Sequence, residues 1–163
     1  MHSIDAANAL CGLTADPRPY VRANAFAGLA LAGHRCKGDP GRTALGNDPS
    51  DEVRAAAALQ LSRSPGPEDV KALELCARAD ASGFVAGRCR VHRPPPAPGG
   101  PAHPTLVYVV PEGGEVPRPG APCAVLLADG LLRTATTDRR GAVFDPVAPE
   151  GEISLRRASA LER

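Results

Sequence analysis

The chain has 163 residues, enough for one domain or two small ones. Its 19 Lys and Arg residues nearly balance 18 Asp and Glu residues, and the net charge of +1 argues against binding to nucleic acid by bulk charge. Two Tyr, three Phe and no Trp are too few to predict a base-stacking platform. No apolar run reaches the roughly 18 residues of a membrane span, and the N-terminus lacks the basic-then-apolar pattern of a signal peptide.

A period of 32 residues organises residues 1–92, which we expect to form one helical domain. Several independent columns share this spacing, which predicts three repeat units, each a pair of helices with an Asp-Pro turn between them. The columns are Asp16, Asp48 and Asp80; Val21, Val53 and Val85; Arg22 and Arg54; Leu13, Leu45 and Ala77; and Ala25, Ala57 and Cys89.

The second helix of the middle unit has the clearest signals. Val53, Ala57 and Leu61 recur at i, i+4 and i+8 and define one apolar face. Ser50 is a favoured N-cap, and acidic residues follow it in the first turn, where the helix dipole favours them. By the same logic, we expect the corresponding helices of the first and third units to begin at Pro19 and after Ser82.

The segment Leu13…Asp16-Pro17…Val21-Arg22-Ala23-Asn24-Ala25 and its copy Leu45…Asp48-Pro49…Val53-Arg54-Ala55-Ala56-Ala57 resemble HEAT repeats. The resemblance covers residues 3–91 and implies an α-solenoid in which each Arg pairs with an acidic residue of a neighbouring turn. The third unit departs from the pattern, because Ala86 stands at the Arg position and Gly83 and Gly87 fall within the expected second helix. Such degeneracy is typical of a terminal repeat.

Residues 93–104 are rich in Pro and Gly and predict a linker, which we favour over a ligand for an aromatic groove. Residues 105–163 predict a small antiparallel β-sandwich, because short apolar runs alternate with turn signals such as Asp129-Gly130 and Gly141. The expected strands are 105–110, 123–128, 131–137, 142–145 and 152–156. The predicted fold class is therefore multidomain α+β, a three-repeat α-solenoid followed by a β-sandwich.

The segment Thr136-Thr137-Asp138-Arg139-Arg140-Gly141-Ala142-Val143-Phe144…Pro149-Glu150-Gly151 resembles the carboxypeptidase regulatory-like, or transthyretin-like, module. The resemblance covers about residues 104–157 and implies a non-catalytic accessory domain that displays or docks another protein. A catalytic role for Asp138 is the weaker interpretation, because the turn alone explains an Asp at this position.

The five cysteines are an odd number with irregular spacing, and we expect free thiols in a reducing, cytoplasmic setting. Cys36 lies between Arg35 and Lys37, so it is either a reactive thiol with a lowered pKa or, as we favour, an ordinary loop cysteine. Cys89 and His92 have ligand-like spacing, but a structural zinc site needs about four ligands, so we favour packing of Cys89 in the core. No catalytic, metal or cofactor site is predicted.

The favoured hypothesis is a non-enzymatic scaffold that binds a partner protein through the repeat surface. The N-terminal edge, with Ile4, Ala7, Leu10 and Cys11, is one candidate surface. The alternatives are a regulatory or accessory subunit of an enzyme and, third, a nucleic-acid-binding repeat that uses its arginines: Arg18, Arg22, Arg54, Arg63, Arg88 and Arg90. An enzyme in its own right is less favoured, no membrane partner is expected, and the oligomeric state is left open.

Overall fold

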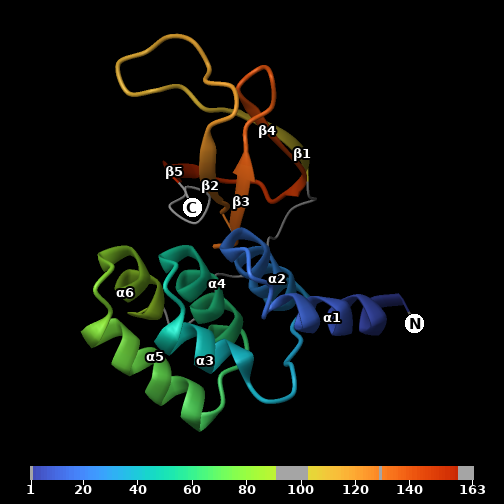
Figure 1. The fold of residues 1–163 in the computed structure, drawn as a ribbon, viewed down its shortest axis with the longest axis vertical. Helices are drawn as coiled ribbons and strands as arrows, with labels where there is room; N and C mark the ends of the chain where they lie inside the picture. Colours follow the sequence, from blue (N-terminus) through green and yellow to red (C-terminus); the bar gives the residue numbers. More distant parts are fainter. Residues whose placement is uncertain (1, 91–102, 129, 158–163) are drawn as a thin grey trace. The chain divides into compact units, whose positions relative to one another are not determined.

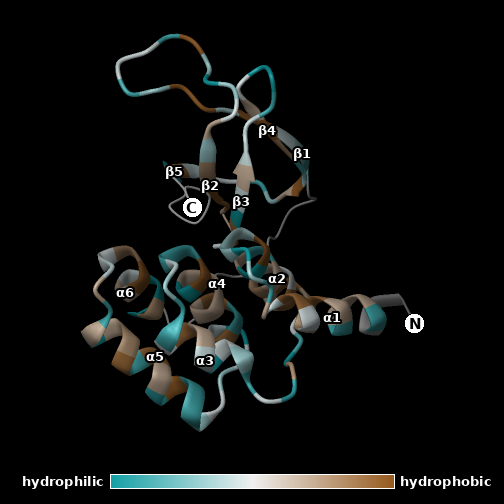
Figure 2. Cartoon of the chain, in the orientation of Figure 1, coloured by the Kyte–Doolittle hydropathy of each residue, from teal (hydrophilic) through white to brown (hydrophobic). Residues whose placement is uncertain are grey.

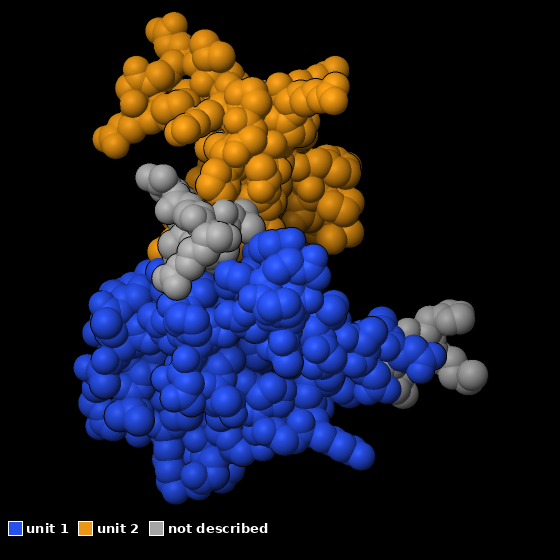
Figure 3. Space-filling model, in the orientation of Figure 1, with its two compact units in different colours: residues 1–94 blue, residues 95–163 orange. Residues whose placement is uncertain are grey.

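The computed structural model describes residues 2–90, 103–128 and 130–157 (Figure 1). The chain divides into two compact units, residues 1–94 and 95–163, coloured separately in Figure 3. The first is helical and the second is built of strands, so the predicted α+β organisation is confirmed. Residues 93–102 of the predicted linker lie outside the described residues, and the first strand begins at His103.

The helical unit contains three helical hairpins. Repeat one pairs α1 with α2, repeat two pairs α3 with α4, and repeat three pairs α5 with α6 (Figure 1). The second helices pack side by side, α2 on α4 and α4 on α6, while α3 packs on α5. The bounds are α1 His2–Leu13, α2 Pro19–Ala32, α3 Pro40–Asn47, α4 Asp51–Ser62, α5 Pro67–Ala79 and α6 Gly83–Arg90.

Local signals set where these helices begin and end. Pro occupies the start of α2, α3 and α5, where its missing N–H is not needed. The Ser50 hydroxyl accepts a 3.4 Å hydrogen bond from the Val53 N–H, which confirms the predicted N-cap of α4. Ser82 makes the equivalent 3.5 Å bond with Val85 at the start of α6. At the other end of α2, Gly33 adopts a left-handed conformation with φ of 59° and caps the helix.

The centre of the helical unit is α4, which contacts α2, α3, α5 and α6. The predicted stripe of Val53, Ala57 and Leu61 is fully buried, as expected. Gly41 lets α3 approach closely, since a Cβ there would lie 2.5 Å from the side-chain oxygen of Gln60. Along α1 and α5, hydrophilic and hydrophobic segments are mixed (Figure 2), and the exposed residues of these helices include Leu13 and Leu75.

The β unit consists of two small antiparallel sheets, one of order β1-β4 and one of order β3-β2-β5. An ion pair between Arg133 of β3 and Asp145 of β4, 3.3 Å apart, joins the two sheets. Buried residues of this unit include Cys123, Ala124, Val125, Leu127, Leu131, Leu132, Ala142, Val143 and Ala148. The bounds are β1 His103–Tyr108, β2 Pro122–Leu126, β3 Leu132–Thr136, β4 Ala142–Ala148 and β5 Ser154–Arg157.

The turn before β4 is held by backbone hydrogen bonds to Asp138. Its Oδ1 accepts from the N–H groups of Ala142 and Arg140 at 2.9 and 2.7 Å, and these bonds lower the pKa of Asp138. Gly141 has the predicted left-handed backbone, with φ of 76°. A Cβ at Gly141 would lie 2.7 Å from the carbonyl carbon of Pro117, so the neighbouring loop also requires glycine. Asp138 is therefore accounted for as a turn residue.

Candidate interaction surface

The repeat-signature residues form a chain of ion pairs between successive repeats. Arg22 donates to both oxygens of Asp48, with Nε–Oδ2 at 2.8 Å and Nη2–Oδ1 at 2.9 Å. Its remaining nitrogen, Nη1, donates to the carbonyls of Asp16 and Pro17 in the turn of its own repeat. One guanidinium thus holds its own turn and the turn of the next repeat together.

Arg54 repeats this arrangement 32 residues later. It donates to Asp80 through Nε and Nη2, at 2.8 and 3.0 Å, and to the carbonyls of Asp48 and Pro49 through Nη1. We call the four charged residues Arg22, Asp48, Arg54 and Asp80 the Arg–Asp ladder. The hydrogen bonds that Arg22 and Arg54 donate to the aspartates raise the pKa of both arginines despite their partial burial, so the ladder stays charged.

The ladder has a defined beginning and end within the described repeats. At its beginning, Arg18 donates to both oxygens of Asp16 at 2.9 Å, and this pair together with a backbone hydrogen bond lowers the pKa of Asp16 to about 2. At its end, Ala86 occupies the position of the next arginine. The valine column directly precedes the arginine positions in the sequence: Val53 and Val85 are fully buried and Val21 is half-buried.

This geometry makes the ladder a structural element that fixes one repeat against the next. A second set of ion pairs has the same character, because Arg35 contacts the buried carboxylate of Asp69 at 2.9 Å and Arg42 contacts it at 3.5 Å. Burial raises the pKa of Asp69, but hydrogen bonds from Arg35 and from the Gly66 N–H outweigh burial and lower it. Several arginines considered for nucleic-acid contact are therefore engaged by neighbouring aspartates.

The prediction of free thiols is wrong for four of the five cysteines. Cys11 is bonded to Cys36, and Cys76 is bonded to Cys89, with Cα–Cα distances of 5.6 and 5.9 Å. Cys36 is therefore not a free reactive thiol in this structure, and Cys89 is buried as expected but cross-linked. Irregular spacing concealed both pairs, because only the folded helices bring these residues together.

The remaining cysteine, Cys123, is free and buried in the β unit, and burial raises its pKa. Among residues 2–90, 103–128 and 130–157, no group of three or more His, Cys, Asp or Glu side chains is placed to hold a metal ion. His92, which the zinc interpretation requires, lies outside the described residues.

The N-terminal edge differs from the expectation of an open apolar surface. Ala7 is buried, and Leu10 and Cys11 are only half-exposed, because α1 packs on α2. The side chain of Ile4 is outside the described residues. Among the large hydrophobic side chains described in the helical unit, Leu75 of α5 has the greatest exposure, at 62%.

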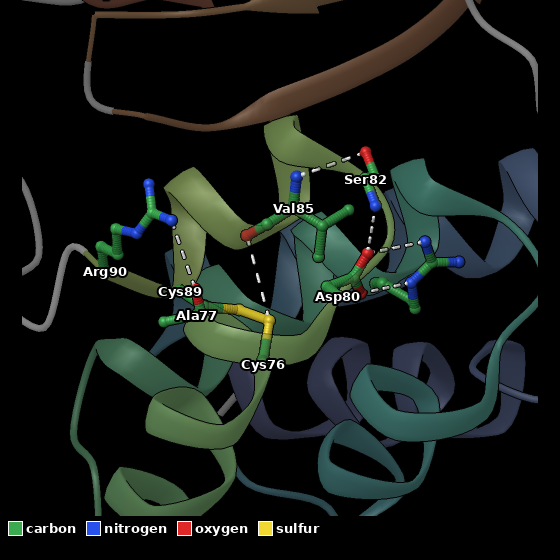
Figure 4. Close-up of a disulfide and its surroundings, with 8 residues drawn as sticks. Cys76, Ala77, Asp80, Ser82, Val85, Cys89 and Arg90 are labelled. Carbon is green, nitrogen blue, oxygen red and sulfur yellow. Dashed lines mark hydrogen bonds and ion pairs between the residues drawn. A yellow bond between two sulfur atoms is a disulfide. The ribbon is translucent and has the colours of Figure 1, made fainter.

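Close to this leucine in the sequence, charged side chains of α5 and α6 line a depression. Glu74, Arg78 and Arg90 line an open depression together with Ala77, and Arg90 donates a 3.4 Å hydrogen bond to the Ala77 carbonyl (Figure 4). We call Glu74, Leu75, Arg78 and Arg90 the α5 patch. The α5 patch combines an exposed leucine with side chains of both charge signs, a mixture that also occurs at protein–protein contacts.

Paired helices, a constant 32-residue period and the Arg–Asp ladder define the helical unit as an α-solenoid of two-helix repeats. The family model for HEAT repeats matches residues 7–90, more than half of the chain, and the chain belongs to this family. Comparison with curated proteins and with solved structures gives no match. Within the part of the chain that the structure describes, no helix has the length and hydropathy to cross a membrane.

Proposed function

We propose that this protein is a non-enzymatic scaffold that binds a partner protein through the surface of its HEAT repeats. The observation that carries the proposal is the α5 patch, an exposed leucine with charged neighbours on a helix whose other face is fixed. HEAT repeats commonly mediate protein–protein interaction, and stacked repeats of this kind present an extended surface to their partners.

The packing of α5 explains why the patch is available. Leu73 and Cys76 are buried on the inner face, and Asp69 is held by Arg35 and Arg42. These anchors fix the rotation of the helix, so Leu75 cannot turn inward to lower its exposure. An apolar side chain held on a rigid helix loses little conformational freedom when a partner covers it, which favours binding.

For the β unit, we propose an accessory role of the carboxypeptidase regulatory-like kind, as a second docking or display domain. Support comes from the Thr137-Asp138…Gly141 turn and the antiparallel sheets that follow the expected pattern. The expectation of a cytoplasmic setting depended on free thiols, and the two disulfides remove that support.

Affinity capture from host cells with the full-length chain tests the scaffold proposal. The bait variants are Leu75→Glu and, as a matched control, Thr43→Glu, which places the same charge at the exposed equivalent position one repeat earlier. We expect a stoichiometric partner that wild type and Thr43→Glu retain and that Leu75→Glu loses at least ten-fold. Equal recovery by all three baits would contradict the α5 patch, and no partner for a folded wild-type bait would contradict the scaffold itself. A captured enzyme would identify the accessory-subunit alternative.

A further inference from the structure

The two disulfides of the helical unit lie in different surroundings. Cys76 and Cys89 join α5 to α6 inside repeat three and are 8% and 0% exposed. Cys11 and Cys36 join the end of α1 to the 33–39 loop between repeats one and two, and both are half-exposed. Thiol–disulfide exchange requires access of the attacking thiolate to a sulfur atom, so the two bonds differ in their accessibility to a reductant.

We propose that Cys11–Cys36 is a site of thiol–disulfide exchange with a dithiol reductant, and that its reduction releases α1 from the repeat unit. This inference does not depend on the proposed scaffold function. The half-exposed Cys11–Cys36 bond is the reactive one, and the buried Cys76–Cys89 bond is an internal reference for the rate of reduction.

The balanced reaction transfers two electrons and two protons from the dithiol to the protein. A reductant thiolate attacks Cys11 Sγ, the Cys11–Cys36 bond breaks, and Cys36 leaves as a thiolate. Arg35 and Lys37 flank Cys36 in the sequence, and neighbouring cations favour a thiolate leaving group. The second thiolate of the reductant then attacks the reductant's own sulfur in the mixed disulfide and expels Cys11 as a thiolate, which takes up a proton. The reductant is left as a disulfide and both protein cysteines are reduced.

The loop that carries Cys36 stays anchored after this reaction. Arg35 is paired with Asp69 of α5, and the Gln60 side chain of α4 donates a 3.0 Å hydrogen bond to the carbonyl of His34. The loop is therefore attached to repeats two and three by contacts that reduction does not touch.

The helix on the other side of the bond has fewer attachments. Among the described residues, α1 packs on α2, with the Leu10 side chain next to Gly28, and its C-terminal end is joined to the 33–39 loop by the disulfide. Loss of the bond leaves packing on α2 as the principal helix–helix contact of α1. Local opening there would uncover Leu10 of α1 and the surface of α2 around Gly28.

Differential alkylation of the full-length protein measures the first half of the proposal. Native protein is exposed to dithiothreitol for increasing times, new thiols are blocked with iodoacetamide, and the remaining disulfides are then reduced and labelled with N-ethylmaleimide for mass spectrometry. We expect Cys11–Cys36 to open at least ten-fold faster than Cys76–Cys89. Equal rates for both pairs, or the absence of a Cys11–Cys36 bond in air-oxidised protein, would overturn the proposal.

Hydrogen exchange measures the second half. After selective reduction, we expect amides of α1 to exchange at least ten-fold faster, while amides of α4 keep their rates. The variant Cys11→Ser/Cys36→Ser should reproduce the reduced wild type, and Cys76→Ser/Cys89→Ser should leave α1 unchanged. If the first variant does not fold, reduced wild type supplies the measurement. Unchanged α1 exchange after reduction would show that the disulfide does not restrain the helix and would overturn the release of α1.

Discussion

Repeats two and three have the same helical hairpin but are stabilised by different chemistry. In repeat two, α4 is a 12-residue helix whose Arg54 reaches forward to Asp80. In repeat three, α6 has 8 residues, Ala86 replaces the arginine, and a disulfide joins the two helices (Figure 4). Repeat three has no arginine to pair with a following repeat, but a disulfide joins its two helices. The repeat fold therefore tolerates the loss of a signature residue.

The largest effect should come from Arg54→Ala, which removes the ladder ion pair between repeats two and three. The Arg54 and Asp80 side chains are 15% and 8% exposed, so the variant leaves a mostly buried carboxylate and two turn carbonyls without their donor. We expect a loss of about 3–4 kcal/mol in the free energy of unfolding, measured with urea. Arg18→Ala is the control: it removes the ion pair with Asp16, in which the Arg18 side chain is 58% exposed, and should change the free energy of unfolding little. Similar losses for both variants would contradict a special role for the ladder.

Removal of the internal cross-link in repeat three should be the next largest effect. Cys76 and Cys89 are 13 residues apart, and opening a loop of this length is expected to destabilise the folded protein by about 3 kcal/mol. Cys76→Ala/Cys89→Ala should therefore unfold at lower urea concentration than oxidised wild type. If fully reduced wild type and the variant match oxidised wild type, the disulfide is not what compensates for Ala86.

Acid should reveal the charge on which the ladder depends. Burial raises the pKa of Asp80, but hydrogen bonds from Arg54 and the Ser82 N–H outweigh it and lower the pKa below its ordinary value of 3.8. A carboxylate whose pKa is lower in the folded state contributes stability that is complete above pH 3.8 and is lost as the pH falls through the folded pKa. Asp80→Asn should thus lower the free energy of unfolding by about 2 kcal/mol at pH 7. The difference in free energy of unfolding between wild type and Asp80→Asn should become smaller below pH 4.

Urea unfolding of wild type and Asp80→Asn at a series of pH values checks this expectation. Asp69→Asn is a useful companion, because the pKa of Asp69 is lowered in the same direction. A difference between wild type and Asp80→Asn that stays constant down to pH 2.5 would mean that the ion pair does not stabilise the folded state.

The smallest expected effect is a gain. Gly87 lies inside α6 with no atom within 4 Å of an added Cβ, so Gly87→Ala should stabilise the protein by about 0.5–1 kcal/mol. Gly28→Ala is the matched comparison in α2: its Cβ would lie 2.9 Å from the end of the Leu10 side chain, which would have to move, so we expect a smaller gain in stability than for Gly87→Ala. A loss in both variants, read from thermal unfolding, would show that the glycines of α6 are required rather than tolerated.

The sequence predicted the helix starts well, because the signals at Pro19, Ser50 and Ser82 act on their own neighbours. It predicted the end of β4 less well. We expected the strand to stop at Asp145 before Pro146, but β4 continues to Ala148. The pairing of β4 with β1 is irregular there, with His103 opposite Ala148 and Thr105 opposite Asp145. Pro146 therefore lies where no backbone N–H needs a partner.

The surface chemistry was harder to predict than the fold. The disulfides depend on distances between helices, which no local spacing encodes. The exposure of Leu75 depends on which face of α5 the buried residues Leu73 and Cys76 fix inward. A leucine in an amphipathic helix is normally assigned to the core, so only the packed structure distinguishes Leu75 from its buried neighbours.

The Arg–Asp ladder also bears on how such an array can grow. Each arginine bonds to an aspartate 26 residues ahead, a span shorter than the 32-residue period, so the block 49–80 carries both Arg54 and its acceptor Asp80. Tandem duplication of that block would add one donor and one acceptor together and leave neither unmatched. The protein could therefore lengthen by whole repeats in a single genetic event, without a compensating mutation of any other charged residue.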